Sequence, residues 1–358
     1  MKSSRKTVAI VGFGFMGRTH YGNWRRMKGA EVVAICDSNL AQLSSKVKGN
    51  VGCADDSTDF SGIDVYSDFD EMLSRCPCDI VDVTLPTPLH PRMAVAALAA
   101  GRDVVLEKPM AIDAAACDEM LAAARGAKGR FMVAQCLRFQ AEHAYVKRLI
   151  DGRRYGKVVS ADFSRVSMTP GWGAGGGKSW FLDEAKSGGV ALDLHIHDTD
   201  LVNWWFGMPE SVASRERRRA DGVCAHIATS YAYPDKVVGA VGSWVDAPSF
   251  VFEASFRVVF ESAVVVCDTR RAPSFVVYPA KGRPFTPKFV GCADGYFNEL
   301  KAFLGWTRRP SAASPFDVRE ARDSVAIVDA ERRSARTGRR VSLGRGASAT
   351  KWRAAPAP

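Results

Sequence analysis

The sequence predicts an α/β chain in which a doubly wound parallel sheet is followed by a second domain with a large, mostly antiparallel sheet. Up to residue 136, short apolar runs alternate with helical stretches, as in successive β-α-β units. From Glu210 to Tyr278, runs rich in β-branched and aromatic residues follow one another directly, as in an antiparallel sheet. A length of 358 residues suits two domains. The expected divisions are a first domain over 1–136, a second over 137–345 and a disordered tail over 346–358.

The expected strands of the first domain are short apolar runs bounded by turn residues, and the expected helices lie between them. The strands are Thr7–Val11, Glu31–Cys36, Asp79–Leu85, Asp103–Glu107 and Arg130–Cys136, with a weaker one at Asn50–Ala54. The helices are Phe15–Lys28, Asn39–Lys48, Asp68–Arg75, Pro91–Ala100 and Asp113–Ala127.

The second domain is expected to begin with a helix and a strand, and to end with two helices that follow its sheet. In chain order the segments before the sheet are the helix Ala141–Ile150, the strand Lys157–Val166, the glycine-rich loop Pro170–Lys178 and the helix Val190–Phe206. The terminal helices are Asp294–Leu304 and Asp317–Thr337.

Composition and charge exclude several classes of protein. No apolar run approaches the roughly 20 residues of a membrane-spanning helix, and the first run, Val8–Val11, is shorter than a signal-peptide core. The net charge of +10 is concentrated in segments such as Arg215–Arg219, without aromatic residues between the basic ones. We therefore expect a cytoplasmic protein with no membrane or nucleic-acid partner. The nine cysteines contain no C-x-x-C pair, which indicates reduced thiols rather than a zinc site.

A dinucleotide-binding motif follows the first strand. The strand Val8–Val11 runs into Gly12-Phe13-Gly14-Phe15-Met16-Gly17, and a helical pattern follows. Gly12 permits a tight turn, Gly14 lets the backbone approach a pyrophosphate, and Gly17 lets helix and strand pack closely. The helix N-terminus then offers N–H groups to the phosphates.

The end of the second strand indicates which dinucleotide binds. Asp37 lies twenty residues beyond Gly17, where a carboxylate accepts hydrogen bonds from the adenosine ribose and repels a 2′-phosphate. Ser38 and Asn39 provide no cation, which favours NAD. Arg18 leaves NADP possible, because its side chain could swing outward to a phosphate.

Further motifs accompany this one in a fixed order along the chain. They are His20, Thr84-Leu85-Pro86-Thr87-Pro88-Leu89-His90, Glu107-Lys108-Pro109, Ser187-Gly188-Gly189, Asp193-Leu194-His195-Ile196-His197-Asp198, Gly295-Tyr296 with Glu299, and Ser334-Ala335 to Gly338-Arg339-Arg340-Val341. From about residue 7 to 343 the chain thus resembles the glucose-fructose oxidoreductase / inositol dehydrogenase / rhizopine-catabolism family. The resemblance implies a Rossmann domain, then an α/β domain whose large antiparallel sheet assembles homodimers or homotetramers.

The resemblance also implies the catalytic residues. The lysine of its Glu-Lys-Pro motif is catalytic, and here it is Lys108, at the end of a predicted parallel strand where such sheets bind ligands. An ammonium there stabilises negative charge on a reacting oxygen. The family's Asp-x-x-x-His pair falls on Asp193 and His197, which share one helical face. The imidazole of His197 is then the proton acceptor and donor, supported by Asp193.

Other residues are expected around the cofactor and the substrate. Those expected to line the cofactor cleft, with Glu107 near the nicotinamide ribose, are Thr84, Pro86, Thr87, His90 and Glu107. Those expected near the substrate are Gln135, Arg138, Trp172, Trp180 and His195, with packing as the alternative for His195 and the two tryptophans. One helix cannot aim His195, His197, Asp198 and Asp200 at a single ion, so no metal is expected.

Together these features predict reversible NAD-dependent oxidation of a secondary alcohol on a sugar, inositol or related polyol. Two alternatives stay open. One is a glycoside-cleaving enzyme that keeps its NAD and oxidises its substrate transiently. The other is a non-catalytic nicotinamide sensor.

Overall fold

The computed structural model describes residues 5–44, 60–171, 179–289, 291, 294–309 and 311–344. Within these ranges the chain forms two compact units. The first comprises the described parts of 1–136 and 296–322, and the second those of 137–295 and 323–350. No helix in the described ranges is both long and apolar enough to cross a membrane.

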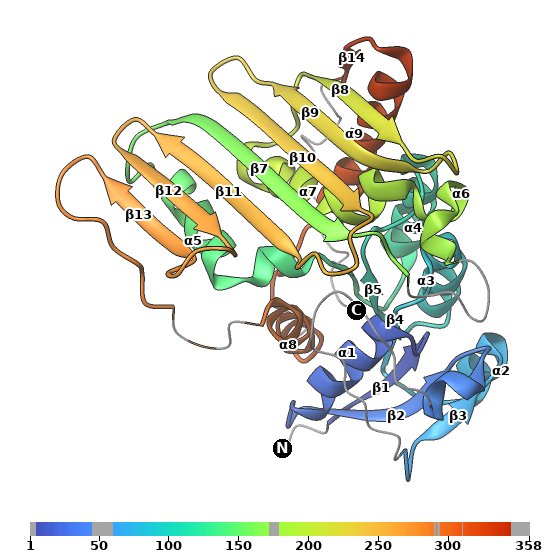
Figure 1. The fold of residues 1–358 in the computed structure, drawn as a ribbon. Helices are drawn as coiled ribbons and strands as arrows, with labels where there is room; N and C mark the ends of the chain where they lie inside the picture. The colour runs from blue at the N-terminus through green and yellow to red at the C-terminus, as the bar shows by residue number, and fades with distance from the viewer. Residues whose placement is uncertain are drawn as a thin grey trace. The chain divides into compact units, whose positions relative to one another are not determined.

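The first unit is built on a parallel sheet of six described strands in the order β3-β2-β1-β4-β5-β6 (Figure 1). The strands are β1 (Lys6–Val11), β2 (Ala30–Cys36), β3 (Asp64–Tyr66), β4 (Ile80–Val83), β5 (Asp103–Glu107) and β6 (Phe131–Ala134). Every residue of β4, β5 and β6 is buried, as expected for a parallel sheet covered on both faces. This order confirms the predicted doubly wound fold, whose ligand crevice lies where the order reverses, at β1 and β4.

The helices of this unit connect its strands. They are α1 (Phe15–Arg25), α2 (Phe69–Arg75), α3 (His90–Ala99) and α4 (Ala114–Gly126), with 3-10 turns η1 (Leu40–Ser44) and η2 (Thr87–Leu89). The 3-10 turn η3 (Cys136–Phe139) begins at the last residue of this stretch and continues into the second unit. Asp68 and Asp113 cap α2 and α4 by accepting N–H bonds from Glu71 and Ala116.

Two details of the first unit differ from the sequence prediction, and a third expectation falls outside the described residues. The expected helix over 39–48 is a 3-10 turn at 40–44, beginning where Asp37 accepts the N–H of Asn39, and residues 45–48 lie outside the described ranges. β3 was not predicted, because three residues carry no clear alternation. The weak strand over 50–54 also lies outside the described residues.

Helix α8 (Gly295–Thr307), expected in the second domain, lies in the first unit from Tyr296 onward. Its apolar side chains Leu300, Phe303 and Leu304 are buried. The guanidinium of Arg130 contacts the ring of Trp306 and donates to the carbonyl of Thr307.

The second unit has a sheet of eight described strands in the order β13-β12-β11-β7-β10-β9-β8-β14. Its bounds are β7 (Val158–Met168), β8 (Ser211–Arg218), β9 (Cys224–Ala232), β10 (Val237–Val245), β11 (Glu253–Phe260), β12 (Ala263–Asp268), β13 (Phe275–Pro279) and β14 (Val341–Ser342). Among the described strands, β7 and β10 form the one parallel pair and the remaining neighbours are antiparallel. The predicted, mostly antiparallel sheet is therefore confirmed.

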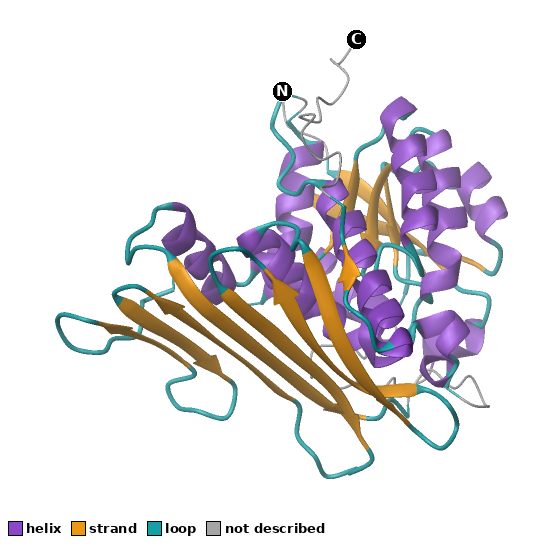
Figure 2. Cartoon of the chain, turned by 90° about the horizontal axis from the view of Figure 1, so that it is seen from above, coloured by secondary structure: helices purple, strands orange, loops and turns teal. Residues whose placement is uncertain are grey.

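Helices cover one face of this sheet, and the other, the bare face, carries none of the helices in the described ranges (Figure 2). The helices of the unit are α5 (Ala141–Asp151), α6 (Glu184–Ser187), α7 (Ile196–Phe206) and most of α9 (Val318–Thr337), with the 3-10 turn η4 (Trp180–Leu182) and the π-helical turn η5 (Ala191–His195). The single helix expected over 190–206 is thus a π-helical turn followed by an α-helix.

Candidate functional site

The turn from β1 into α1 has room for glycine alone at two positions, one in the loop and one in the first turn of the helix. Gly12 has a φ of 92°, and a Cβ there would lie 2.9 Å from the carbonyl oxygen of Thr84. A Cβ on Gly17 would lie 2.1 Å from the carbonyl oxygen of Gly12. The hydroxyl of Thr84 donates to that same oxygen at 2.6 Å. The loop is therefore held in the tight form that a pyrophosphate-binding turn needs.

Helix α1 starts at Phe15, directly after this loop, with Gly14 as its N-cap. The first N–H groups of a helix, here those of Phe15, Met16 and Gly17, have no partner within the helix. Together with the helix dipole they form an anion-binding end. The residues present thus fit a dinucleotide phosphate.

The carboxylate of Asp37 lies beside the glycine loop. One of its oxygens accepts the N–H of Phe13 at 2.7 Å and the other that of Asn39 at 2.8 Å. Arg18 is fully buried, lies over the ring of Phe13 and donates to the carbonyl of Leu43 at 2.9 Å. Swinging outward to a 2′-phosphate would break these contacts, so the structure does not favour the role for Arg18 that left NADP open.

Lys108 is the accessible residue of an otherwise buried strand end. From Asp103 to Ala111 every residue is buried except Lys108, which is partly exposed. Its backbone N–H donates to Oε2 of Glu107 at 2.8 Å. The imidazole of His90 bonds the carbonyls of Pro109 and Leu85, which fixes the following residue and the loop after β4. Burial lowers the pKa of His90 despite these bonds.

Asp193 and His197 form a similar accessible spot in the second unit. From Val190 to Asn203 every residue is buried except these two, which are partly exposed. Asp193 lies in η5 and His197 in the first turn of α7. The helical stretch therefore presents a carboxylate and an imidazole and buries the rest.

The neighbours of this pair have structural partners. The guanidinium of Arg138 forms a two-pronged ion pair with Asp200 at 2.7 and 2.8 Å, and that of Arg165 pairs in the same way with Asp198. These contacts favour a structural role for Arg138 rather than the expected substrate contact. They also give both aspartates a cation other than a metal.

His195, expected near the substrate or in the core, is fully buried. Its Nε2 lies 3.4 Å from a carboxylate oxygen of Glu331 in α9 and 3.3 Å from the hydroxyl of Tyr231. Burial lowers its pKa, but the charge and hydrogen bond of Glu331 outweigh burial and raise the pKa overall. These contacts tie η5 to α9 and favour packing over substrate contact for His195.

The remaining expected residues are placed as follows. Gln135 is buried at the end of β6, and its Nε2 has no hydrogen-bond partner among the described residues. Thr87 is buried in η2, which Pro86 precedes. Trp180 stacks on Phe181 with ring centroids 4.0 Å apart. Trp172 lies outside the described residues.

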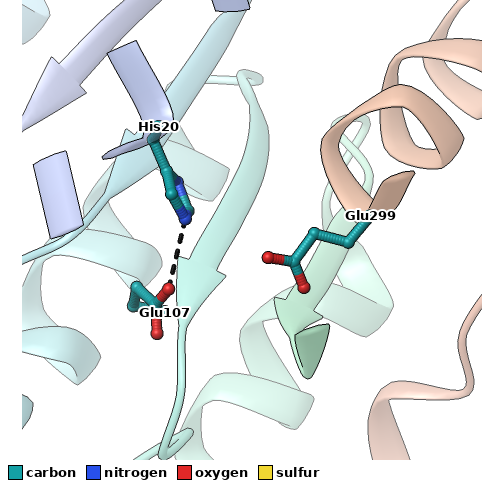
Figure 3. A group of neighbouring side chains, drawn as sticks. All are labelled: His20, Glu107 and Glu299. Carbon is teal, nitrogen blue, oxygen red and sulfur yellow. Dashed lines mark hydrogen bonds and ion pairs between the residues drawn. The ribbon is translucent and has the colours of Figure 1, made fainter. Parts of the chain in front are cut away.

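Sequence reasoning missed a buried polar cluster in the first unit (Figure 3). The ring of His20 lies between Asp82, 2.9 Å from Nδ1, and Glu107, 3.1 Å from Nε2. The carboxylate of Glu299, from α8, points toward them. Burial lowers the pKa of His20, but the two carboxylates outweigh it and raise the pKa well above its ordinary value. His20 and Glu299 stood out in the sequence only as parts of motifs, because no local pattern shows that they meet.

The topology, the glycine loop and Asp37 together define a two-unit protein with a dinucleotide-binding first unit. The model of the "Oxidoreductase family, NAD-binding Rossmann fold" matches residues 6–135, and that of the "GFO/IDH/MocA C-terminal domain" matches residues 143–266. The chain therefore belongs to the GFO/IDH/MocA family of oxidoreductases, and its first unit is the family's NAD-binding domain.

Individual relatives differ in what their names say they do. The chain is similar to D-apiose dehydrogenase of Paraburkholderia graminis, with 28% identity over 59% of this chain and 52% of the relative. It is 32% identical to 2,7-anhydro-N-acetylneuraminate hydratase of Mediterraneibacter gnavus over 58% of this chain and 52% of the relative. The matches thus span about half the length of these curated relatives.

Solved structures share the fold along almost the whole chain. Levoglucosan dehydrogenase in complex with NADH and L-sorbose has a TM-score of 0.81 at 18% identity, covering 95% of this chain and 99% of that one. The WlbA dehydrogenase of Bordetella pertussis, in complex with NADH and UDP-GlcNAcA, has a TM-score of 0.76 at 22% identity, with the same coverage.

Proposed function

We propose that this chain is an NAD-dependent dehydrogenase that interconverts a secondary alcohol and a ketone on a sugar, inositol or related polyol. The observation that carries the proposal is the exposure of Lys108 alone at the buried carboxyl end of β5, in the domain whose glycine loop fits a dinucleotide. The names of relatives and neighbours, which include sugar dehydrogenases, support this substrate class.

Each accessible polar group has a role in this proposal. NAD held by the glycine loop and Asp37 would supply the hydride acceptor for the carbinol carbon. The ammonium of Lys108 hydrogen-bonds the reacting oxygen and stabilises negative charge on it. His197 accepts the hydroxyl proton during oxidation and returns it during reduction, because an imidazole titrates near neutral pH. Asp193 orients that imidazole.

Other residues fit the cofactor and the substrate. Phe15 and Met16 at the start of α1 bind the pyrophosphate, and Asp37 selects NAD over NADP through the ribose hydroxyls. The donor group of Gln135 is available to an acceptor atom of cofactor or substrate.

A panel of sugars and inositols with NAD and with NADP tests the proposal. We expect an absorbance change of the nicotinamide with at least one polyol and NAD. One relative is named a hydratase, so the same panel also tests the alternative of an enzyme that keeps its NAD and causes no net oxidation of its substrate. Consumption of a substrate without net absorbance change, by a protein purified with its cofactor, would replace the dehydrogenase with that alternative. Cofactor binding without any turnover would support a sensor.

We also propose that the chain assembles as a homodimer or homotetramer through the bare face of its second sheet. Small side chains form a row across this face, namely Ala228, Val241, Ser164 and Ser255 on β9, β10, β7 and β11. Val237 and Val241 are exposed on it, by 74% and 42%. A row of small side chains with exposed valines beside it suits close packing against a second sheet.

A further inference from the structure

The cluster around His20 is separate from the glycine loop and Asp37. It lies at the carboxyl ends of two strands of the first unit. His20 comes from α1, Asp82 from β4 and Glu107 from the last position of β5. All three are buried, by 95% or more. Their polar contacts are therefore made away from water, where an unsatisfied group is costly.

Both carboxylate oxygens of Glu107 have a donor of their own. Oε1 lies 3.1 Å from Nε2 of His20, and Oε2 accepts the backbone N–H of Lys108 at 2.8 Å. Glu107 thus links an imidazole in α1 to the main chain of Lys108.

Asp82 holds His20 from the other side. Nδ1 of His20 lies 2.9 Å from Oδ2 of Asp82, and the indole N–H of Trp24 donates to the same oxygen at 2.6 Å. A ring that faces a carboxylate at each nitrogen satisfies both carboxylates only when each nitrogen carries a proton. His20 is then a buried cation between two anions.

From this geometry we infer that His20 and Glu107 are positioning residues for Lys108. The His20 ring holds Glu107 so that its second oxygen fixes the Lys108 backbone. The same helix α1 begins at the glycine loop, so it carries both the phosphate-binding end and this anchor. The inference rests on the proposed function, which gives Lys108 its chemical role.

Glu299 makes a metal ion the competing interpretation. One carboxylate oxygen of Glu299, one of Glu107 and a ring nitrogen of His20 lie within 4.8 Å of one another. A divalent cation there needs a deprotonated ring nitrogen, whereas the contacts of His20 place protons on both. The geometry favours the proton, and metal content is one readout of the test.

Two substitutions of His20 separate its contact with Asp82 from its contact with Glu107. The amide of an asparagine falls near the position of Nδ1 and keeps a donor to Asp82. The amide of a glutamine reaches the position of Nε2 and keeps a donor to Glu107. We expect amide hydrogen exchange at Lys108 to accelerate about ten-fold or more in His20→Asn and to change less than about two-fold in His20→Gln. Mass spectrometry of the peptide that contains Lys108 measures this, and Pro109 adds no amide signal.

Asp103→Asn is the matched control, because Asp103 lies at the other end of β5 and also accepts a backbone N–H, that of Arg130 at 2.9 Å. Exchange at Lys108 should not change in it. Should His20→Asn fail to fold, Glu107→Gln replaces it, since it removes the ion pair and keeps an oxygen for Lys108. Equal acceleration of exchange at Lys108 in His20→Asn and His20→Gln would overturn the inference. So would unchanged exchange at Lys108 in His20→Asn or in its replacement Glu107→Gln. So would a stoichiometric metal ion in the natural chain that is lost in His20→Asn.

This readout needs no turnover, so a chain that oxidises no polyol refutes the proposed function alone. Where a polyol is oxidised, kcat should fall about 10- to 100-fold in His20→Asn while the KM of the polyol and the Kd of NAD change less than about two-fold. Faster exchange with an unchanged kcat would show that the contact supports the fold and not the chemistry, and would overturn the positioning role.

Discussion

Lys108 places an ammonium at a largely buried strand end, where removing a charge from water costs free energy. The residues on either side of it are buried, its own N–H is held by Glu107, and the carbonyl of Pro109 is held by His90. A backbone held this firmly fixes the position from which the Lys108 side chain extends. Preorganisation of this kind is what allows a single donor to stabilise charge in a transition state.

Removing the proposed catalytic groups should affect rate more than binding. We expect Lys108→Ala and His197→Ala each to lower kcat about 10²- to 10³-fold, because each loses a contact that strengthens in the transition state. Binding of NAD, measured by calorimetry, should change little. Lys128→Ala, at an exposed position of the first unit, is the control. An unchanged rate in either variant removes that residue from the mechanism.

Asp37 should set the choice of cofactor. Asp37→Ser removes the charge that repels a 2′-phosphate, so we expect the ratio of kcat/KM for NAD to that for NADP to fall about ten-fold or more. Arg18→Lys serves as the control, because the guanidinium of Arg18 is buried against Phe13 and donates to the carbonyl of Leu43. A variant of Asp37 with the original ratio would show that another residue reads the ribose.

At the scale of elements, His20 connects α1 to the ends of β4 and β5, and its contacts predict how stability depends on pH. Its pKa is raised in the folded chain above the ordinary value of about 6.5. The contribution of protonated His20 to the free energy of unfolding is therefore complete below about pH 6.5. It is lost as the pH rises through the pKa that His20 has in the folded chain. The difference in Tm between the natural chain and His20→Gln should shrink from about pH 6.5 to pH 9. Thermal melts across this range check it, and a constant difference would mean that His20 carries no extra proton.

The second unit has a comparable close contact between β10 and η5. A Cβ on Gly242 would lie 2.8 Å from the Cβ of His195, closer than folded proteins tolerate. Gly242→Ala should therefore lower the free energy of unfolding by about 1–3 kcal/mol. Gly239→Ala, in the same strand, is the matched control, since its Cβ would meet only the carbonyl oxygen of Thr229 at 3.4 Å. Urea denaturation measures both, and equal effects would contradict the predicted contact.

Local patterns explain which elements were predictable. β1, α1 and β2 follow from the glycine loop and from hydrophobic periodicity, which are properties of neighbouring residues. The ion pairs of Arg138 with Asp200 and of Arg165 with Asp198 join residues 62 and 33 positions apart, so no local signal announces them. Arg138 was for that reason expected at the substrate, although its guanidinium is held by Asp200.

At the scale of the whole molecule, contacts between distant parts of the sequence are harder still to predict. Most of α8 is in the first unit although about 160 residues of the second unit separate it from β6 along the chain. Its attachment depends on contacts such as that of Arg26 with the ring of Phe297. A division of the sequence into two consecutive domains cannot place a helix that follows the second unit in sequence but packs in the first. The same packing brings Glu299 to His20 and Glu107, which is why that cluster was not predicted.

The bare face of the second sheet leads to a prediction about assembly. Its central strands β7 and β10 carry Ser164 and Val241 as neighbours on that face, and exposed valines favour association with a like apolar surface. Val241→Lys places a charge at the centre of the face without disturbing the buried side of β10, where Ala240 and Gly242 lie. We expect the natural chain to be a dimer or tetramer and Val241→Lys to shift it to smaller species, as measured by light scattering after size exclusion.

The control for assembly is Val251→Lys, at a residue that is 77% exposed but lies between β10 and β11 rather than on either strand. It adds the same charge to the chain, so any effect of net charge on association appears in both variants. Dissociation in Val241→Lys alone assigns the interface to the sheet. A natural chain that is monomeric at micromolar concentration, or an unchanged assembly in Val241→Lys, would mean that the bare face packs against no second copy and that its small residues have another cause.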